Sequence, residues 1–168
     1  MKTQKLTILA LFTAAALILS LVESAFPPLV PIPGIRLGLA NIVTLIILLN
    51  FTPGNALCVL LARILLASIF SGQAMSLLYS LAGGTVCFFV MWGINRLLTG
   101  HYIFLTSIFG GCFHNIGQIL AAFLITGTAG VFAYLPILLI SGIVTGLFTG
   151  LCAHFAQRFL TRHIDFPM

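Results

Sequence analysis

The sequence predicts an all-α integral membrane protein, a bundle of six transmembrane helices. The first observation is composition: 61% of the 168 residues are hydrophobic, only 5% are charged, and the mean hydropathy is +1.24. A soluble domain uses roughly a quarter of its residues as charges. The second observation is that the apolar runs are continuous, which favours helices over the alternating pattern of a transmembrane barrel. Lipid is therefore expected to be the main solvent of this chain.

Six apolar windows define the expected helices, within one membrane domain that covers residues 1–168. A helix needs roughly 20 residues to cross about 30 Å of hydrocarbon. The second window ends before Pro53-Gly54 and is short, so it is expected to cross a thinned or protein-lined region. The expected spans are residues 6–23, 37–52, 55–71, 75–95, 103–126 and 130–157.

The distribution of basic residues predicts the orientation of the bundle. With the N-terminus inside, only Arg36 lies in an outer loop and Arg63 lies within a span, while five basic residues face the cytoplasm. A signal-peptide interpretation of the first 25 residues is disfavoured, since the apolar run is long and its removal would leave an odd number of spans. We expect a multi-pass protein of the cell membrane with both termini cytoplasmic. The five cytoplasmic residues are Lys2, Lys5, Arg96, Arg158 and Arg162.

The scarcity of carboxylates excludes several enzyme classes. Only two acidic residues are present, Glu23 and Asp165, whereas a prenyl diphosphate synthase of the usual kind binds Mg²⁺ through aspartate-rich clusters. The chain has no G-x-x-x-x-G-K-[ST] loop, so it cannot hydrolyse ATP through a P-loop. Its four cysteines fall singly in four spans and are expected to be small apolar residues. We expect no catalytic residue, cofactor, metal site or nucleic-acid partner.

Arg63 lies near the middle of the third span, in ALCVLLARILLASIF. A charged side chain there costs roughly 2.5–3.5 kcal/mol on insertion scales, so something must compensate for it. One interpretation is that Arg63 snorkels to an interface or bonds a backbone carbonyl. The favoured interpretation is that its planar five-donor guanidinium faces a polar cavity and contacts an anionic or strongly polar ligand.

A polar patch interrupts the fifth span, in FGGCFHNIGQIL. His114 and Gln118 are four residues apart and share a helix face, with Asn115 beside them. Such groups often serve only as hydrogen-bonding contacts between helices, and Gln118 alone would be read that way. For the three together we favour contact with a ligand. His114 has no partner at metal-ligand spacing, so a metal site is not expected.

Arg36 and Asn41 lie at the start of the second span, close to the expected outer surface. They follow the proline-rich stretch FPPLVPIPG, whose prolines stiffen an extended cap. Such a cap suits a cover over a pocket that captures a substrate. Arg36 is placed either to meet an incoming ligand or only to anchor the loop at the interface.

Small residues at four-residue spacing predict close helix contacts in two spans. In the sixth span, Gly142, Gly146 and Gly150 form a ridge that is expected to pack inside the bundle. In the first span, Ala10 and Ala14 form A-x-x-x-A, and this face is a candidate for contact with another subunit. The motif is common by chance in apolar helices, so it is weak evidence alone.

The order of these features resembles the heptaprenyl diphosphate synthase component I family, also called the Gx transporter family. The resemblance rests on the alanine-rich first helix (ALFTAAALILSLVES), the proline-rich outer loop, PGIRLGLANIV at the second helix and FTPGNA at the third. The run P-G-x-R-L-G-L-A-N is its most specific part. More distantly, the chain resembles the substrate-binding S components of energy-coupling factor (ECF) vitamin transporters.

The resemblance implies a six-helix bundle with a ligand pocket toward the extracellular side, under the first loop. It also implies a small-residue face on the first helix that docks on a transmembrane scaffold subunit coupled to paired ATPases. Ala10 and Ala14 would correspond to that docking motif, and Arg36 and Asn41 lie in the family's loop and second-helix signature.

Two functions remain open from the sequence. The leading hypothesis is a substrate-capture component of a small-molecule transporter, which binds an anionic, polar or amphipathic ligand and is energised by ECF-type scaffold and ATPase subunits. The alternative is a non-catalytic membrane partner of a heptaprenyl diphosphate synthase in isoprenoid or quinone biosynthesis. The absence of aspartate clusters suits a component defined by association with a catalytic subunit.

Overall fold

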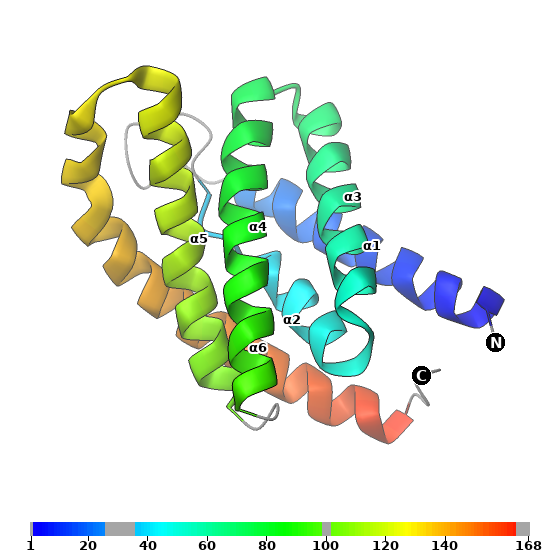
Figure 1. Cartoon of the computed structure of the whole chain (residues 1–168). Helices are drawn as coiled ribbons and strands as arrows, with labels where there is room; N and C mark the ends of the chain where they lie inside the picture. Colours follow the sequence, from blue (N-terminus) through cyan, green and yellow to red (C-terminus); the bar gives the residue numbers. More distant parts are fainter. Residues whose placement is uncertain (1, 26–35, 99–101, 164–168) are drawn as a thin grey trace.

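The computed structural model is a helical bundle and describes residues 2–25, 36–98 and 102–163 (Figure 1). Six α-helices and one 3₁₀ helix occupy most of these residues, and no strand occurs within them, which confirms the predicted all-α class. The elements are α1 (Lys2–Ala25), α2 (Asn41–Asn50), α3 (Pro53–Ser71), α4 (Ala74–Leu97), α5 (Ile103–Thr126), η1 (Ala129–Tyr134) and α6 (Leu135–His163).

Five of these helices are long and apolar enough to cross a membrane: α1, α3, α4, α5 and the η1–α6 segment. Helix α2 has only 10 residues, which is about 15 Å at 1.5 Å per residue. Seven of its residues are buried, and it contacts every other α-helix. The short second helix is therefore lined by protein, as the sequence suggested.

The start of the second helix differs from its predicted position, and the sixth span is divided into two helices; local backbone geometry explains both. The second helix begins at Asn41 rather than at residue 37, because Gly38 adopts a positive φ of 85° and the chain turns before the helix starts. The sixth span begins with the separate 3₁₀ helix η1, and α6 starts only at Leu135. Pro136 then occupies the first turn of α6, where its missing N–H is tolerated.

Glycines allow α5 and α6 to pack backbone against backbone. A Cβ on Gly146 would lie 2.7 Å from the Cα of Ile108, and a Cβ on Gly111 would meet the carbonyl oxygen of Gly142. Contacts this close leave no room for a side chain. The predicted internal role of the sixth-span glycines is confirmed.

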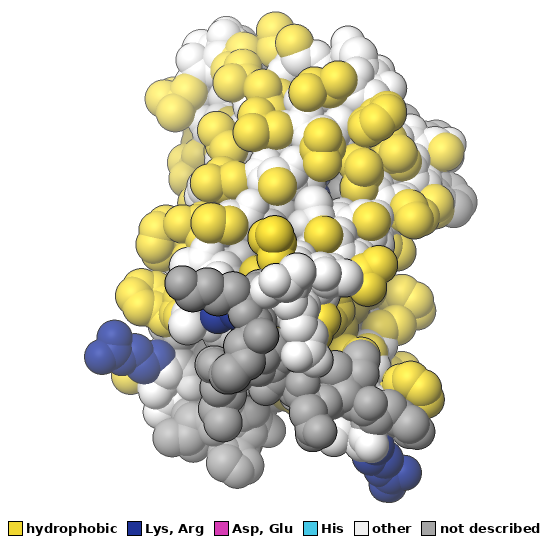
Figure 2. Space-filling view, turned by 90° about the vertical axis from the view of Figure 1, so that its right-hand side faces the viewer, with side chains coloured by type: hydrophobic (Ala, Val, Ile, Leu, Met, Phe, Trp, Pro, Cys, Tyr) yellow, Lys and Arg dark blue, Asp and Glu magenta, His cyan; other side chains and the backbone are white. Residues whose placement is uncertain are grey.

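The outer surface of the bundle is apolar. Figure 2 shows hydrophobic side chains over most of the upper part of one face, whereas the Lys and Arg side chains visible on it lie apart from one another in its lower half. The start of α1 and the end of α6 lie toward the same side in Figure 1, and Asn50 at the end of α2 bonds Gln157 of α6 at 2.6 and 2.8 Å. This arrangement is compatible with a multi-pass membrane protein.

Candidate functional site

Most of the buried polar side chains that the sequence singled out meet in one place. We call this place the polar cluster, and it lies where the end of α1, the 36–40 segment and the start of α2 meet α3 and α5. Its members are Ser20, Glu23, Arg36, Asn41, Arg63, His114 and Gln118.

Glu23 organises the start of α2. One carboxylate oxygen accepts the Gly38 N–H at 2.6 Å, and the other accepts the Leu39 N–H at 3.1 Å. These N–H groups precede the first turn of the helix, where the backbone dipole favours a negative charge. A Cβ on Gly38 would lie 2.7 Å from Asn41 Nδ2 and 2.9 Å from His114 Cδ2, so this bend also requires glycine for close packing.

Arg63 is compensated from within the protein. The residue is 5% exposed, and its guanidinium donates to Ser20 Oγ at 3.1 Å and to Asn41 Oδ1 at 3.0 Å. It also interacts electrostatically with Glu23. A buried charge persists only when it is hydrogen-bonded and its charge is balanced. Ser20 and Asn41 supply the hydrogen bonds, and Glu23 supplies a nearby opposite charge. Neither snorkelling nor a ligand is therefore needed to keep Arg63 in the bundle.

Gln118 joins the 36–40 segment to His114. Its Oε1 accepts the Arg36 backbone N–H at 3.2 Å, which turns the amide nitrogen toward His114 Nε2 at 2.8 Å. The amide can only donate there, so His114 Nε2 accepts and the proton of the neutral ring is on Nδ1. That nitrogen faces the backbone of Gly83 in α4 without a well-aligned hydrogen bond.

Asn115 does not join the polar cluster. Its Nδ2 donates to the Leu138 carbonyl at 2.6 Å and lies 3.4 Å from Ser141 Oγ, both in α6. One residue along a helix rotates a side chain by about 100°, so Asn115 faces a different neighbour from His114. It acts as a contact between α5 and α6 rather than as part of the site.

Besides His114 Nδ1, three side-chain donors in the polar cluster remain open. Arg36 Nη2, Asn41 Nδ2 and Arg63 Nε are buried and have no hydrogen-bond partner among the residues that the structure describes. An unpaired buried donor costs about 1–3 kcal/mol. The cluster contains two guanidinium groups but only one carboxylate, so its charge is not balanced if all three groups are ionised. A ligand group with negative charge and several oxygen acceptors would suit the three open donors.

Arg36 is the member of the cluster nearest to the outside. Partial burial lowers the pKa of its guanidinium, and the negative charge of Glu23 opposes this effect. An arginine keeps its proton in proteins despite such shifts. The side chain therefore offers a permanent positive charge at the edge of the cluster.

One charged residue of the polar cluster was missed by the sequence analysis, and two other expectations from the sequence are not tested by the single chain. Glu23 was not among the expected site residues, although a lone carboxylate and a lone intramembrane arginine in one apolar chain are natural partners. Ala10 and Ala14 are exposed on α1, so none of the described residues covers the face that they form. Their docking role stays a prediction. The proline-rich stretch lies outside the described residues.

Comparison with known proteins identifies the family. A family model described as heptaprenyl diphosphate synthase component I matches residues 12–156. Searches of curated proteins and of solved structures found no match. The resemblance to S components of ECF transporters is therefore not confirmed, and no finding supports the transporter as the leading function. The match covers most of the chain, and the chain belongs to the heptaprenyl diphosphate synthase component I family.

Proposed function

We propose that this chain is the non-catalytic membrane component of a prenyl diphosphate synthase and works with a separate catalytic subunit. The observation that carries the proposal is that the chain has no carboxylate cluster that could bind Mg²⁺. The chain has two acidic residues in all, and both oxygens of Glu23 accept backbone N–H groups. The other, Asp165, lies outside the described residues.

Prenyl chain elongation requires what this chain cannot supply. Mg²⁺ bound to a diphosphate is held by several carboxylate oxygens in a synthase. One carboxylate that is already hydrogen-bonded and one in the C-terminal tail do not make such a cluster. The metal-binding groups must therefore come from the partner, and this chain contributes the membrane-embedded part.

A membrane component suits the physical properties of the product. Each buried CH₂ group contributes about 0.8 kcal/mol to partition out of water, so a growing polyprenyl chain increasingly favours the bilayer. A helical bundle in the cell membrane, with its basic end toward the cytoplasm, would hold a soluble synthase where the product dissolves. Arg96, Arg158 and Arg162 are exposed and available for that contact.

The test is binding between defined, purified partners. The tagged chain in phosphatidylcholine nanodiscs is mixed with the catalytic prenyl diphosphate synthase subunit of the same organism, and separately with ECF scaffold and ATPase subunits. Empty nanodiscs are the control. We expect retention of the synthase alone. Retention of the scaffold and ATPases without the synthase would contradict the proposal and return the transporter to first place.

A further inference from the structure

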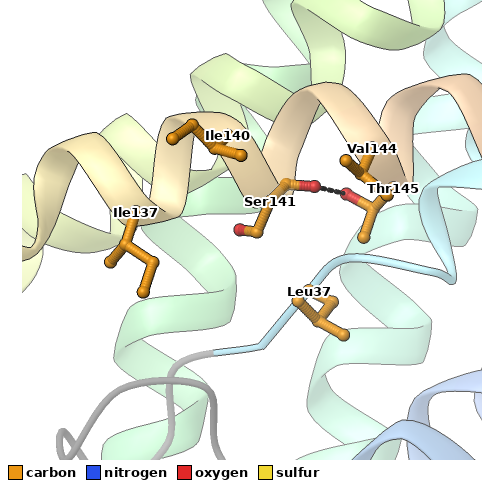
Figure 3. A pocket seen from close by; sticks show the side chains of 6 residues that line it. All are labelled: Leu37, Ile137, Ile140, Ser141, Val144 and Thr145. Carbon is orange, nitrogen blue, oxygen red and sulfur yellow. Dashed lines mark hydrogen bonds between the residues drawn. The ribbon is translucent and has the colours of Figure 1, made fainter.

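An apolar groove runs along the outside of α6. It has a volume of about 320 Å³, and Figure 3 shows Leu37 facing the α6 residues across it. The two hydroxyl groups in its wall are turned to the helix backbone, because Ser141 donates to the Leu138 carbonyl at 2.9 Å and Thr145 donates to the Ser141 carbonyl at 2.8 Å. The lining is therefore hydrocarbon throughout. It consists of Leu37, Ile137, Ile140, Ser141, Val144 and Thr145.

This groove adjoins the polar cluster through the backbone of the 36–40 segment. Leu37 lines the groove, while its neighbour Arg36 bonds Gln118 and its neighbour Gly38 bonds Glu23. Adjacent Cα atoms are about 3.8 Å apart, so the segment that lines the groove also borders the polar cluster.

The polar side of this junction has the features of an anion site. Asn41 and Arg63 are 7% and 5% exposed, and each has a buried donor without a partner. Arg36 adds a third open donor, Nη2, which is also buried. The rest of the Arg36 side chain is partly exposed, so an acceptor would enter the cluster on that side. Guanidinium groups match the paired oxygens of phosphates with a planar fork of donors.

We propose that this chain binds a prenyl diphosphate, with the diphosphate at Arg36, Asn41 and Arg63 and the hydrocarbon chain in the groove beside Leu37. The proposal rests on the proposed function for the identity of the ligand. The position of the ligand is inferred from two features: a polar site whose donors lack acceptors, and beside it a groove without exposed polar groups. A single-chain ligand with an anionic head uses both sites, whereas a phospholipid has two chains to place.

The experiment measures binding to the chain alone, in phosphatidylcholine nanodiscs and without any synthase. The probes are farnesyl diphosphate, inorganic pyrophosphate and farnesol, each followed by equilibrium dialysis. We expect farnesyl diphosphate to bind at least about tenfold more tightly than either fragment, because each fragment occupies only one site. Equal affinity for farnesol and farnesyl diphosphate would overturn the assignment of the head group.

Two matched variants test the groove. Ile140 lines it and is 64% exposed, while Ile143 on the same helix does not line it and is 44% exposed. We expect Ile140→Trp to weaken farnesyl diphosphate binding about tenfold and to leave pyrophosphate binding unchanged. Ile143→Trp should change neither. Equal binding by the two variants would remove the groove from the site.

The head-group site is tested with Arg36→Gln, since Arg36 is only partly buried and its backbone contact to Gln118 does not depend on the side chain. This variant should weaken both farnesyl diphosphate and pyrophosphate and leave farnesol unchanged. Nanodiscs rich in phosphatidylglycerol distinguish the source of the ligand. If phosphatidylglycerol displaced bound farnesyl diphosphate as effectively as unlabelled farnesyl diphosphate does, the site would be assigned to a lipid instead.

The outcomes of these experiments can be distinguished from the outcome of the experiment that tests the proposed function. If farnesyl diphosphate fails to bind but the purified synthase is retained, only the ligand site is wrong. If farnesyl diphosphate binds as expected but the synthase is not retained, the site stands and the partnership is wrong.

Discussion

Replacement of Glu23 by glutamine tests how the polar cluster keeps a charge inside the bundle. Glutamine has nearly the same shape but can accept only one of the two N–H groups, from Gly38 at 2.6 Å and Leu39 at 3.1 Å. It also removes the negative charge that interacts with Arg63. Loss of one partner of a directly bonded, buried ion pair costs about 3–5 kcal/mol, and this range is an upper bound for Glu23, whose hydrogen bonds go to the backbone N–H groups rather than to Arg63.

We expect the lower end of that range, about 3 kcal/mol of unfolding free energy, for two reasons. Arg63 keeps its hydrogen bonds to Ser20 and Asn41 in the variant, and glutamine keeps one acceptor. The assay is reversible unfolding in mixed micelles with sodium dodecyl sulfate. Trp92 is the only tryptophan in the sequence and packs against the core around α2, so its fluorescence reports the transition.

A double-mutant cycle separates pairing from general damage. If Glu23 compensates for Arg63, then Glu23→Gln combined with Arg63→Met should cost less than the sum of the two single changes. We expect a coupling of at least about 1 kcal/mol, within the range for residues of one buried network. Additivity of the two changes within about 0.5 kcal/mol would refute the reasoning, because it would mean that the two charges do not sense each other.

Three further predictions concern packing, exposure and charge. Gly146→Ala should lower the unfolding free energy by about 1–3 kcal/mol, since its Cβ would press on the α5 backbone. Gly93→Ala should raise it by about 0.5–1 kcal/mol in the same assay, because nothing lies within 4 Å of that Cβ; the reverse order would contradict the α5–α6 packing. Ala10→Leu with Ala14→Leu should leave the unfolding free energy within about 0.5 kcal/mol, since both residues are exposed; a larger loss would mean that this face packs internally. Arg36→Gln should slow association of farnesyl diphosphate and flatten its dependence on salt in stopped-flow measurements, as charges at the edge of a site do; unchanged kinetics would limit Arg36 to a structural role.

The long helices were predictable because hydropathy and helix length are local properties of the chain. The start of α2 was not, since it depends on the contact of Glu23 with Gly38, 15 residues further along. The split between η1 and α6 was also missed, although Pro136 marks a first turn. Because the residues on both sides of these helix boundaries are apolar, hydropathy does not reveal where one helix ends and the next begins.

The candidate site was predictable in part. The spacing of His114 and Gln118 placed them on one face, and they do contact each other at 2.8 Å. The cost of placing a charge in the membrane indicated that Arg63 needs a compensating partner. The sequence could not show that Ser20 in α1 and Asn41 in α2 are the partners of this α3 residue. The groove beside Leu37 was not predictable, because it depends on how the 36–40 segment lies against α6.

The most direct test of the proposed partnership is the rate of prenyl transfer by the purified synthase subunit, with this chain in nanodiscs and with empty nanodiscs of the same lipid. The assay follows incorporation of labelled isopentenyl diphosphate and the length of the product. We predict a higher rate or a longer product only when the chain is present, and full dependence on the synthase for any activity. Identical rates and product lengths in the two preparations would contradict the account.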